Sequence, residues 1–313
     1  MKIDRILGSK IKNMSEHSVI CFGEVLWDIL PTEKVVGGAP LNVAFQINQL
    51  GVDVAIISKV GDDDLGAGIL SFLKNKDLTT ELIQVDKNFP TGRVIVSFQD
   101  EHSPEYKIIG PVAWDHIDLD SRSKDYIGAA EVLIFGSLSC RSESNKEILL
   151  KIINLSKIRV FDVNLRSPFY TQALIEELLY KSDVIKMSEE ELLKIAEWQS
   201  LSGEEEVVLT QIRKIYGVDI ILLTKGKDGA KCIDESGIVA HPGFPITVED
   251  TIGSGDAFLA GYISKFIKGA GKDDCLKYAC AMGALVASKK GGTAKISEQE
   301  LEGLIHSEMI NNQ

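Results

Sequence analysis

The 313-residue chain has little of what marks several classes of protein. Its five cysteines are odd in number and contain no CxxC pair, which argues against a disulfide framework and a zinc ribbon. No apolar run approaches the roughly 18 residues that span a bilayer. Residues 1–17 also lack the apolar stretch and cleavage site of a signal peptide. We therefore expect a cytoplasmic protein with reduced, buried thiols and no membrane partner, preceded by a loose leader at residues 1–17.

Basic residues are in the minority. The chain has 34 lysines and arginines against 46 aspartates and glutamates, which gives a net charge of −12 and a pI near 5.0. A surface with this excess of negative charge repels a phosphate polyanion. The sequence therefore argues against nucleic acid as the main partner.

Two common phosphate-binding motifs are missing as well. GxxxxGK(S/T) does not occur, so the P-loop with its lysine and its Mg²⁺-binding hydroxyl is not encoded. Gly23 follows the first expected strand without a GxGxxG motif, and Gly253-Ser254-Gly255 lacks the third glycine of a dinucleotide-binding turn. The hydride chemistry of a Rossmann dehydrogenase is therefore disfavoured.

What the chain does have is an alternation of buried strands and helices. Its 44% of apolar residues can bury a full core. Continuous apolar strands interleaved with helices indicate a mostly parallel sheet that is covered on both faces. Strands are expected at 19–22, 54–57, 132–135, 160–161, 184–185 and 220–223, and helices at 39–50, 65–74, 143–155, 174–180, 207–216, 256–268 and 274–288. The prediction is one α/β domain over residues 18–309.

One segment breaks this alternation. Thr91 to Ile109 alternates apolar and polar residues on both sides of a polar turn, which is typical of a hairpin with one face in water. Together with Leu30 to Val36 it can form a small sheet over the carboxyl edge of the main one. We expect this sheet, at about residues 30–36 and 90–110, to act as a lid, although a hairpin without that role has the same pattern.

The strongest chemical signal is a glycine turn that leads directly into an apolar helix, at Asp250–Phe258. Glycines let the backbone approach a ligand closely, and the N–H groups of Gly253, Ser254 and Gly255 at the positive end of a helix can bind an anion. Asp256 follows them. It can be an ordinary charge at a helix N-terminus, or it can accept a proton from a hydroxyl that attacks a phosphoryl group.

Polar residues also follow several expected strands, at the edge where a doubly wound sheet binds its ligands. Asp28 and Asn42 offer acceptors and donors for a polyol, or serve as turn and cap residues. Arg166 is a fixed positive fork for a sugar oxygen or a phosphate. The segment 224–229 can border a nucleotide or form a plain β-turn, and Asp62-Asp63-Asp64 is expected to be a solvated loop.

Taken together, these motifs resemble the ribokinase-like (PfkB-type) carbohydrate kinases over about residues 19–305. The family's amino-terminal signature is similar to 37–42 with Gly51 and Gly61-Asp62, and its carboxyl-terminal signature is similar to 250–258. Five segments look most like bacterial fructokinases: 22–28, 38–42, 90–92, 113–115 and 161–166. The resemblance implies a three-layer α/β/α fold with a mostly parallel central sheet and a small β lid.

The resemblance also implies roles by position. Asp256 would be the base on the sugar hydroxyl, and the anion hole would be Gly253, Ser254 and Gly255. The sugar-binding residues would be Asp28, Gly38, Asn42 and Arg166, and the ATP-binding residues would be Ser188, Thr224, Gly226 and Gly229. Glu191 would act on Mg²⁺ through water, with Ser188 replacing the family's asparagine and weakening that contact. A K⁺ requirement is left open, because Asp250 and Ile252 match only part of the family's K⁺ site.

The implied activity is transfer of the γ-phosphoryl group of ATP to a sugar hydroxyl, with fructose as acceptor and fructose 6-phosphate as product. A 2-keto-3-deoxygluconate kinase or a ribokinase would use the same chemistry, and Arg166 could equally serve a carboxylate acceptor. A sugar-binding sensor without kinase activity is a third alternative. Because lids in this family often pair across a dimer and the hairpin edge is exposed, we expect a homodimer formed through the lid.

Overall fold

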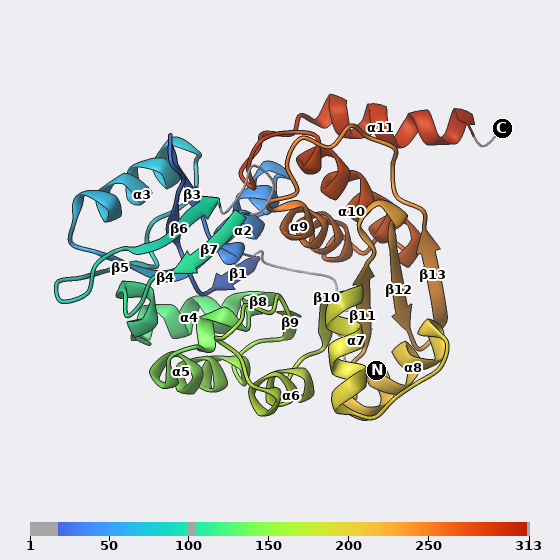
Figure 1. Ribbon diagram of the computed structural model, residues 1–313, viewed down its shortest axis with the longest axis horizontal. Coiled ribbons are helices and arrows are strands. Elements are labelled where there is room, and N and C mark those ends of the chain that lie inside the picture. Colours follow the sequence, from blue (N-terminus) through green and yellow to red (C-terminus); the bar gives the residue numbers. More distant parts are fainter. Residues whose placement is uncertain (1–17, 99–103, 312–313) are drawn as a thin grey trace.

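The computed structural model describes residues 18–98 and 104–311, which form two β-sheets with helices around the larger one (Figure 1). The expected leader at 1–17 lies outside the described residues. The larger sheet has nine strands in the order β13-β12-β11-β10-β9-β8-β1-β4-β5, and the smaller sheet has four in the order β3-β2-β6-β7. The strands from β5 to β11 in this order run parallel, which confirms the mostly parallel sheet.

The bounds of the elements are as follows. The larger sheet contains β1 (Val19–Phe22), β4 (Val54–Gly61), β5 (Ile83–Asp86), β8 (Val132–Gly136), β9 (Ile158–Asp162), β10 (Val184–Ser188), β11 (Ile220–Thr224), β12 (Ala230–Asp234) and β13 (Gly237–His241). The smaller sheet contains β2 (Leu26–Ile29), β3 (Lys34–Gly37), β6 (Gly92–Phe98) and β7 (Pro104–Ile108). The helices are α2 (Ala39–Gln49), α3 (Asp64–Asn75), α4 (Ser121–Ala129), α5 (Glu143–Ile153), α6 (Gln172–Tyr180), α7 (Glu189–Trp198), α8 (Glu205–Tyr216), α9 (Ser254–Phe266), α10 (Lys272–Ala287) and α11 (Glu298–Asn311), with short 3-10 helices η1 (Ala113–His116), η2 (Leu138–Cys140) and η3 (Gly226–Asp228).

Residues of the central strands alternate between two hydrophobic cores. Val19 and Cys21 of β1 belong to the core formed with α2, α3, α9, α10 and α11, whereas Ile20 and Phe22 belong to the core formed with α4 to α8. This alternation follows from the period of two in a strand, and it gives the sheet a layer of helices on each face. The predicted three-layer α/β/α fold is confirmed.

The structure adds an antiparallel hairpin, β12 and β13, that the sequence analysis did not predict. β12 pairs with β11 and β13 pairs with β12, so the hairpin forms the edge of the large sheet. Most of β13 is only half-buried. Because a strand at an edge does not need to be apolar on both faces, it lacks the continuous apolar run by which the central strands were recognised.

The predicted hairpin at 91–109 is present as β6 and β7, although its turn at 99–103 lies outside the described residues. Leu26, Val94 and Val96 form a small core of this four-stranded sheet. β2, which was not predicted as a strand, pairs with β6 and β3 and joins the hairpin to the segment around 34–37. In Figure 1 this sheet lies on the opposite side of the molecule from β12 and β13.

The interpretation of Asp62-Asp63-Asp64 as a solvated loop is wrong for Asp63. Asp63 caps α3 by accepting a hydrogen bond from the N–H of Gly66 at 2.8 Å. Its carboxylate also accepts hydrogen bonds from the N–H and the hydroxyl of Thr91, at 2.9 and 2.6 Å. A capping carboxylate here ties the end of β4 to the start of β6, which a charge run read in isolation does not reveal.

All five cysteines are buried and free, as expected for packing residues. Among the residues that the structure describes, no helix is long and apolar enough to cross a membrane.

Candidate active site

The glycine turn stands at the start of α9, as predicted. Gly253 precedes the helix with a φ of 76°, a left-handed conformation that favours glycine. A Cβ atom on Gly253 would lie 2.2 Å from the Cα atom of Gly292, so the backbones of these two glycines are in close contact. Asp256 is therefore in the first turn of α9, on a backbone held by glycine packing.

The three N–H groups of this turn differ in whether they already have an acceptor. The N–H of Ser254 donates to the carbonyl oxygen of Thr251 at 3.2 Å. Within the described residues, no carbonyl acceptor is found for the N–H of Gly253 or of Gly255. The two glycines, at the positive end of α9, are thus the donors best placed for an anion.

Asp256 is joined to the amino-terminal part of the chain by a hydrogen bond. The Asn42 Nδ2 atom donates to Asp256 Oδ2 at 2.8 Å. Asn42 is in the first turn of α2, which begins after Gly38, whose φ is 113°. A Cβ atom on Gly38 would lie 2.5 Å from the carbonyl oxygen of Glu24, so this position also requires glycine. The two sequence signatures, 214 residues apart, therefore meet at one contact.

Two further carboxyl groups, those of Asp28 and Glu24, share Arg166 with Asp256 as a charged neighbour. Asp28 is half-buried on β2, and a Cβ atom on Gly37 would lie 2.4 Å from its Oδ2 atom. Glu24 is only 3% exposed, and its Oε2 atom has no hydrogen-bond partner among the described residues. Burial raises the pKa of Asp28 to about 6 and that of Glu24 to about 7, while the positive charge of Arg166 opposes both shifts.

The carboxyl group of Asp256 is also perturbed. Burial and, to a lesser extent, the negative charge of Asp162 raise its pKa, to about 6 in all. Lys186, Asn42 and Arg166 oppose this shift. A carboxyl group with a pKa near 6 is ionised at neutral pH yet more basic than an ordinary aspartate, which suits a general base.

A cavity of about 700 Å³ adjoins the start of α9. Thr224, Gly226 and Gly229 line one part of it, and Ser254 and Gly255 line another. Its other lining residues are largely apolar, and include Phe244, Ile246, Phe258 and Ala284. A mostly apolar cavity with a few backbone and hydroxyl groups is typical of a small-molecule site. Three of the four predicted ATP-binding residues are therefore together, next to the glycine turn.

The remaining candidate ATP residue, Ser188, forms the N-terminal cap of α7 with Glu191. The Ser188 hydroxyl accepts a hydrogen bond from the Glu191 N–H at 3.3 Å, and Glu191 Oε2 accepts one from the Ser188 N–H at 2.8 Å. Glu191 Oε1 accepts a hydrogen bond from the N–H of Leu165 at 2.8 Å. In the described parts of the chain, no cluster of three or more His, Cys, Asp or Glu residues is arranged to hold a metal ion.

The candidate K⁺ residues lie just before the glycine turn. Asp250 accepts hydrogen bonds from the N–H of Ile252 at 2.9 Å and from the N–H of Gly291 at 3.0 Å. Gln46 of α2 donates to the carbonyl oxygen of Gly292 at 3.0 Å. The segment at 291–292, which sequence reasoning could not assign, is thus attached to both the turn and α2.

Comparison with protein families decides the class of enzyme. The model of the pfkB family carbohydrate kinases matches residues 6–299. The chain is a PfkB-family carbohydrate kinase. It is therefore a phosphotransferase with a hydroxyl group as acceptor, as the sequence analysis predicted.

Several relatives of this PfkB kinase are known. An uncharacterized sugar kinase from Pyrococcus horikoshii has a solved structure with a TM-score of 0.78 and 27% identity, covering 92% of this chain and 99% of its own. Fructokinase-2 of Solanum lycopersicum is 27% identical over 308 residues, which are 88% of this chain and 92% of the relative. A fructokinase from Xylella fastidiosa with bound ATP has a TM-score of 0.84 at 22% identity, covering 94% of this chain and all of its own, and shows the same fold.

Two buried polar residues near this candidate site were not singled out in the sequence analysis. Glu24 lies two residues after β1, where the sequence analysis named only Asp28 as the polar residue that follows this strand. Lys186 is a charged residue inside the buried strand β10 and hydrogen-bonds to Asp162 Oδ1 at 2.8 Å. A lysine within an apolar strand was the available signal for this second residue, because lysine is almost never buried unless it is paired.

Proposed function

We propose that the protein is an ATP-dependent fructokinase that converts fructose to fructose 6-phosphate. The observation that carries the proposal is the hydrogen bond from Asn42 Nδ2 to Asp256 Oδ2 at 2.8 Å. Asp256 thereby joins Asn42 of α2 to the first turn of α9, where the preceding residue, Gly255, lines the cavity. That position supports a role for its carboxylate between an acceptor hydroxyl and a phosphoryl donor.

The charges on the acceptor side favour a neutral sugar. Glu24, Asp28 and Asp256 bring three carboxyl groups to this region, against the single guanidinium of Arg166. An acceptor with its own carboxylate, such as 2-keto-3-deoxygluconate, would meet repulsion from most of these groups. A polyol instead gains acceptors for its hydroxyl protons. Fructokinases from Solanum lycopersicum and Solanum tuberosum among the relatives support fructose over ribose.

In the proposed reaction, Asp256 accepts the proton of the sugar hydroxyl as the hydroxyl oxygen forms a bond to the γ-phosphorus of ATP. The bond from that phosphorus to the bridging oxygen breaks, and ADP leaves with the electron pair. The N–H groups of Gly253 and Gly255 would stabilise the charge on the transferring oxygens. The catalytic effect of the site would thus come from positioning and electrostatics.

ATP would occupy the cavity beside Thr224, Gly226 and Gly229, where the two glycines, which have no side chain, leave room for a nucleotide. When Mg²⁺ is bound with ATP, it neutralises part of the negative charge of the phosphates. Glu191 would reach the ion through water, because both of its carboxylate oxygens already accept backbone N–H groups. Asp250 and Ile252 would form part of a K⁺ site, and replacing K⁺ by Na⁺ in the assay tests this role.

The four-stranded sheet would act as the lid. Closing over the sugar would exclude water, which otherwise competes with the sugar as phosphoryl acceptor. β7 is an edge strand of this sheet, and pairing of two such edges would form a homodimer. Size-exclusion chromatography with light scattering tests the dimer. The five free cysteines fit an enzyme of the reducing cytoplasm.

The function is tested by coupled ADP release with ATP and Mg²⁺ across fructose, ribose, 2-keto-3-deoxygluconate, adenosine and glucose. Fructose-dependent turnover that Asp256→Asn abolishes would support both the reaction and the acceptor. Turnover on another acceptor alone would replace fructose and retain the mechanism. Sugar binding by calorimetry without turnover on any acceptor would instead support the sensor alternative.

A further inference from the structure

A buried ion pair lies directly beneath the glycine turn. Lys186 of β10 is 7% exposed and Asp162 of β9 is 3% exposed. The two residues face each other across the parallel strands, and Lys186 Nζ donates to Asp162 Oδ1 at 2.8 Å. The Oδ2 atom of Asp162 is buried without a hydrogen-bond partner among the described residues. A buried pair with an unsatisfied oxygen is costly to folding, so a functional reason for it is expected.

The lysine of this pair touches the backbone that carries Asp256. A Cβ atom on Gly255 would lie 3.1 Å from Lys186 Nζ, so the ammonium group is in contact with the first turn of α9. Glycine at 255 allows this approach, because a Cβ atom there would be in tight contact with the ammonium group and would require it to shift slightly. The ion pair and the proposed base are therefore parts of one charged cluster.

The charges around Asp256 come from several elements. They are Glu24 before β2, Asp162 of β9, Arg166 in the loop after β9 and Lys186 of β10, with Glu191 of α7 next to Lys186. The thiol of Cys21 on β1 is a further titratable neighbour, but burial raises its pKa and keeps it uncharged. From α2, Asp256 receives the neutral amide of Asn42. The uncharged end of α10 packs on α9, with Gly283 next to Ser254. Lys186 is thus the cation that lies deepest among these carboxyl groups.

We propose that Lys186 is a positioning residue for phosphoryl transfer, whose ammonium group balances the paired negative charges of Asp162 and Asp256 so that Asp256 meets the acceptor as a carboxylate. This role rests on the proposed function of Asp256. It explains why a charged pair replaces apolar residues in the middle of the sheet. Burial opposes the charge of Lys186, but the carboxylates of Asp162, Glu191 and Asp256 raise its pKa, so the ammonium group persists at neutral pH.

The test is the pH profile of kcat for the wild type, Lys186→Met and Asp162→Asn. Removing the cation should raise the pKa of Asp256, so the acid limb of the Lys186→Met profile should move up by about one pH unit. Removing the neighbouring carboxylate should move the limb down in Asp162→Asn. The double variant, which has lost both charges, should return towards the wild-type limb. A folded Lys186→Met with an unmoved limb would overturn the proposal.

Lys59→Met is the matched control, because Lys59 is equally buried and is also paired with aspartates. It should lower the melting temperature without moving the acid limb. If Lys186→Met does not fold, Asp162→Asn provides the test of the proposal. An acid limb of its pH profile that stays in place or moves to higher pH contradicts the charge balance.

A second readout separates this proposal from the proposed function. The ¹³C chemical shift of the Asp256 carboxyl group, assigned with Asp256→Asn, reports its titration in the absence of any acceptor. A shifted titration in Lys186→Met, in a protein that phosphorylates none of the tested sugars, would support the charge balance and reject the proposed function. If the wild type is an active kinase and Asp256 has the same titration curve in the wild type and in Lys186→Met, the charge balance is rejected and the proposed function is retained.

Discussion

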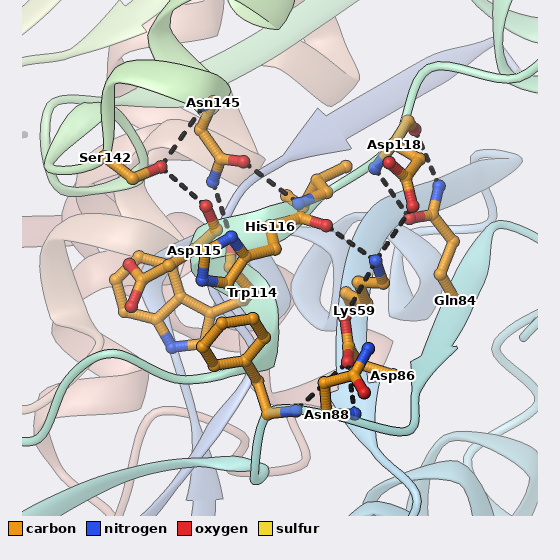
Figure 2. Close-up of polar contacts among 12 residues, drawn as sticks. Lys59, Gln84, Asp86, Asn88, Trp114, Asp115, His116, Asp118, Ser142 and Asn145 are labelled. Carbon is orange, nitrogen blue, oxygen red and sulfur yellow. Dashed lines mark hydrogen bonds and ion pairs between the residues drawn. The ribbon is translucent and has the colours of Figure 1, made fainter.

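Two buried lysines of this kinase are paired with aspartates, and they differ in how fully their partners are satisfied. Lys59 Nζ has three acceptors, the carbonyl oxygen of His116 at 2.7 Å, Asp118 Oδ2 at 2.8 Å and Asp86 Oδ2 at 2.9 Å (Figure 2). The other oxygen of Asp86 accepts two backbone N–H groups. Lys186 instead holds an aspartate whose second oxygen has no partner in the described part of the chain.

The contrast teaches how to tell a structural charge from a functional one. Around Lys59, every proton of the ammonium group has an acceptor, and the result is a tie between β4, β5 and the segment after η1 (Figure 2). Around Lys186, the network is left incomplete next to the glycine turn and Asp256. Natural proteins satisfy most of their buried polar groups, so an unsatisfied carboxylate oxygen beside the proposed base is a candidate for a functional role. The comparison predicts that the first region carries stability and the second carries activity.

The largest effect is expected at Asp256. Asp256→Asn should lower kcat by about 10²–10⁴-fold, because asparagine cannot accept the hydroxyl proton. The binding of sugar and of ATP should be retained, and so should the melting temperature, because the asparagine oxygen can still accept the hydrogen bond from Asn42. Steady-state ADP release, calorimetry and thermal unfolding measure the three properties. Near-normal turnover would remove Asp256 from the role of base.

Lys59→Met should have the opposite effect, a loss of stability with little loss of activity. The variant leaves Asp86 buried without its cation, which should cost about 3–5 kcal/mol of unfolding free energy in urea denaturation. Burial raises the pKa of Asp86, but N–H groups and Lys59 lower it below its ordinary value. The pair therefore stabilises the protein above the ordinary pKa of aspartate, and this contribution is lost as the pH falls. The deficit of Lys59→Met should accordingly shrink in acid.

The kcat of folded Lys59→Met at neutral pH should stay close to the wild-type value. A large loss of kcat with little loss of stability would break the division between the two regions. Lys59→Arg is the accompanying control, because it keeps the positive charge and should recover part of the stability.

The sequence predicted the class of fold and the glycine turn because both depend on local patterns. The apolar strands, the helices between them and the run from Gly253 to Asp256 are each readable within a few residues. The contact between Asn42 and Asp256 could not be predicted from such patterns, because only the folded chain brings the two residues together. Lys186 was missed because the predicted strand ended at Ile185, one residue before the charge.

The smallest effect is expected at Glu24, whose Oε2 atom, like Oδ2 of Asp162, is buried without a hydrogen-bond partner among the described residues. Burial raises its pKa from 4.5 to about 7, so the folded state favours the neutral form. The wild type should therefore lose stability as the pH rises from 4.5 through 7, and a neutral glutamine should not. Glu24→Gln should match the wild type below pH 4.5 and exceed it above pH 7, by up to about 3 kcal/mol.

Glu300→Gln provides a control of opposite sign for that measurement. Hydrogen bonds from Lys289 and Ser297 lower the pKa of Glu300 to about 2, so its charged form stabilises the fold above its ordinary pKa of 4.5. Glu300→Gln should therefore be less stable than the wild type at neutral pH, and the difference should vanish in acid. Melting temperatures of both variants from pH 4 to 8 make the comparison. If the difference in melting temperature between Glu24→Gln and the wild type does not change with pH, the carboxylate of Glu24 already has its hydrogen-bond partners. Glu24 would then belong with Lys59 among the structural charges.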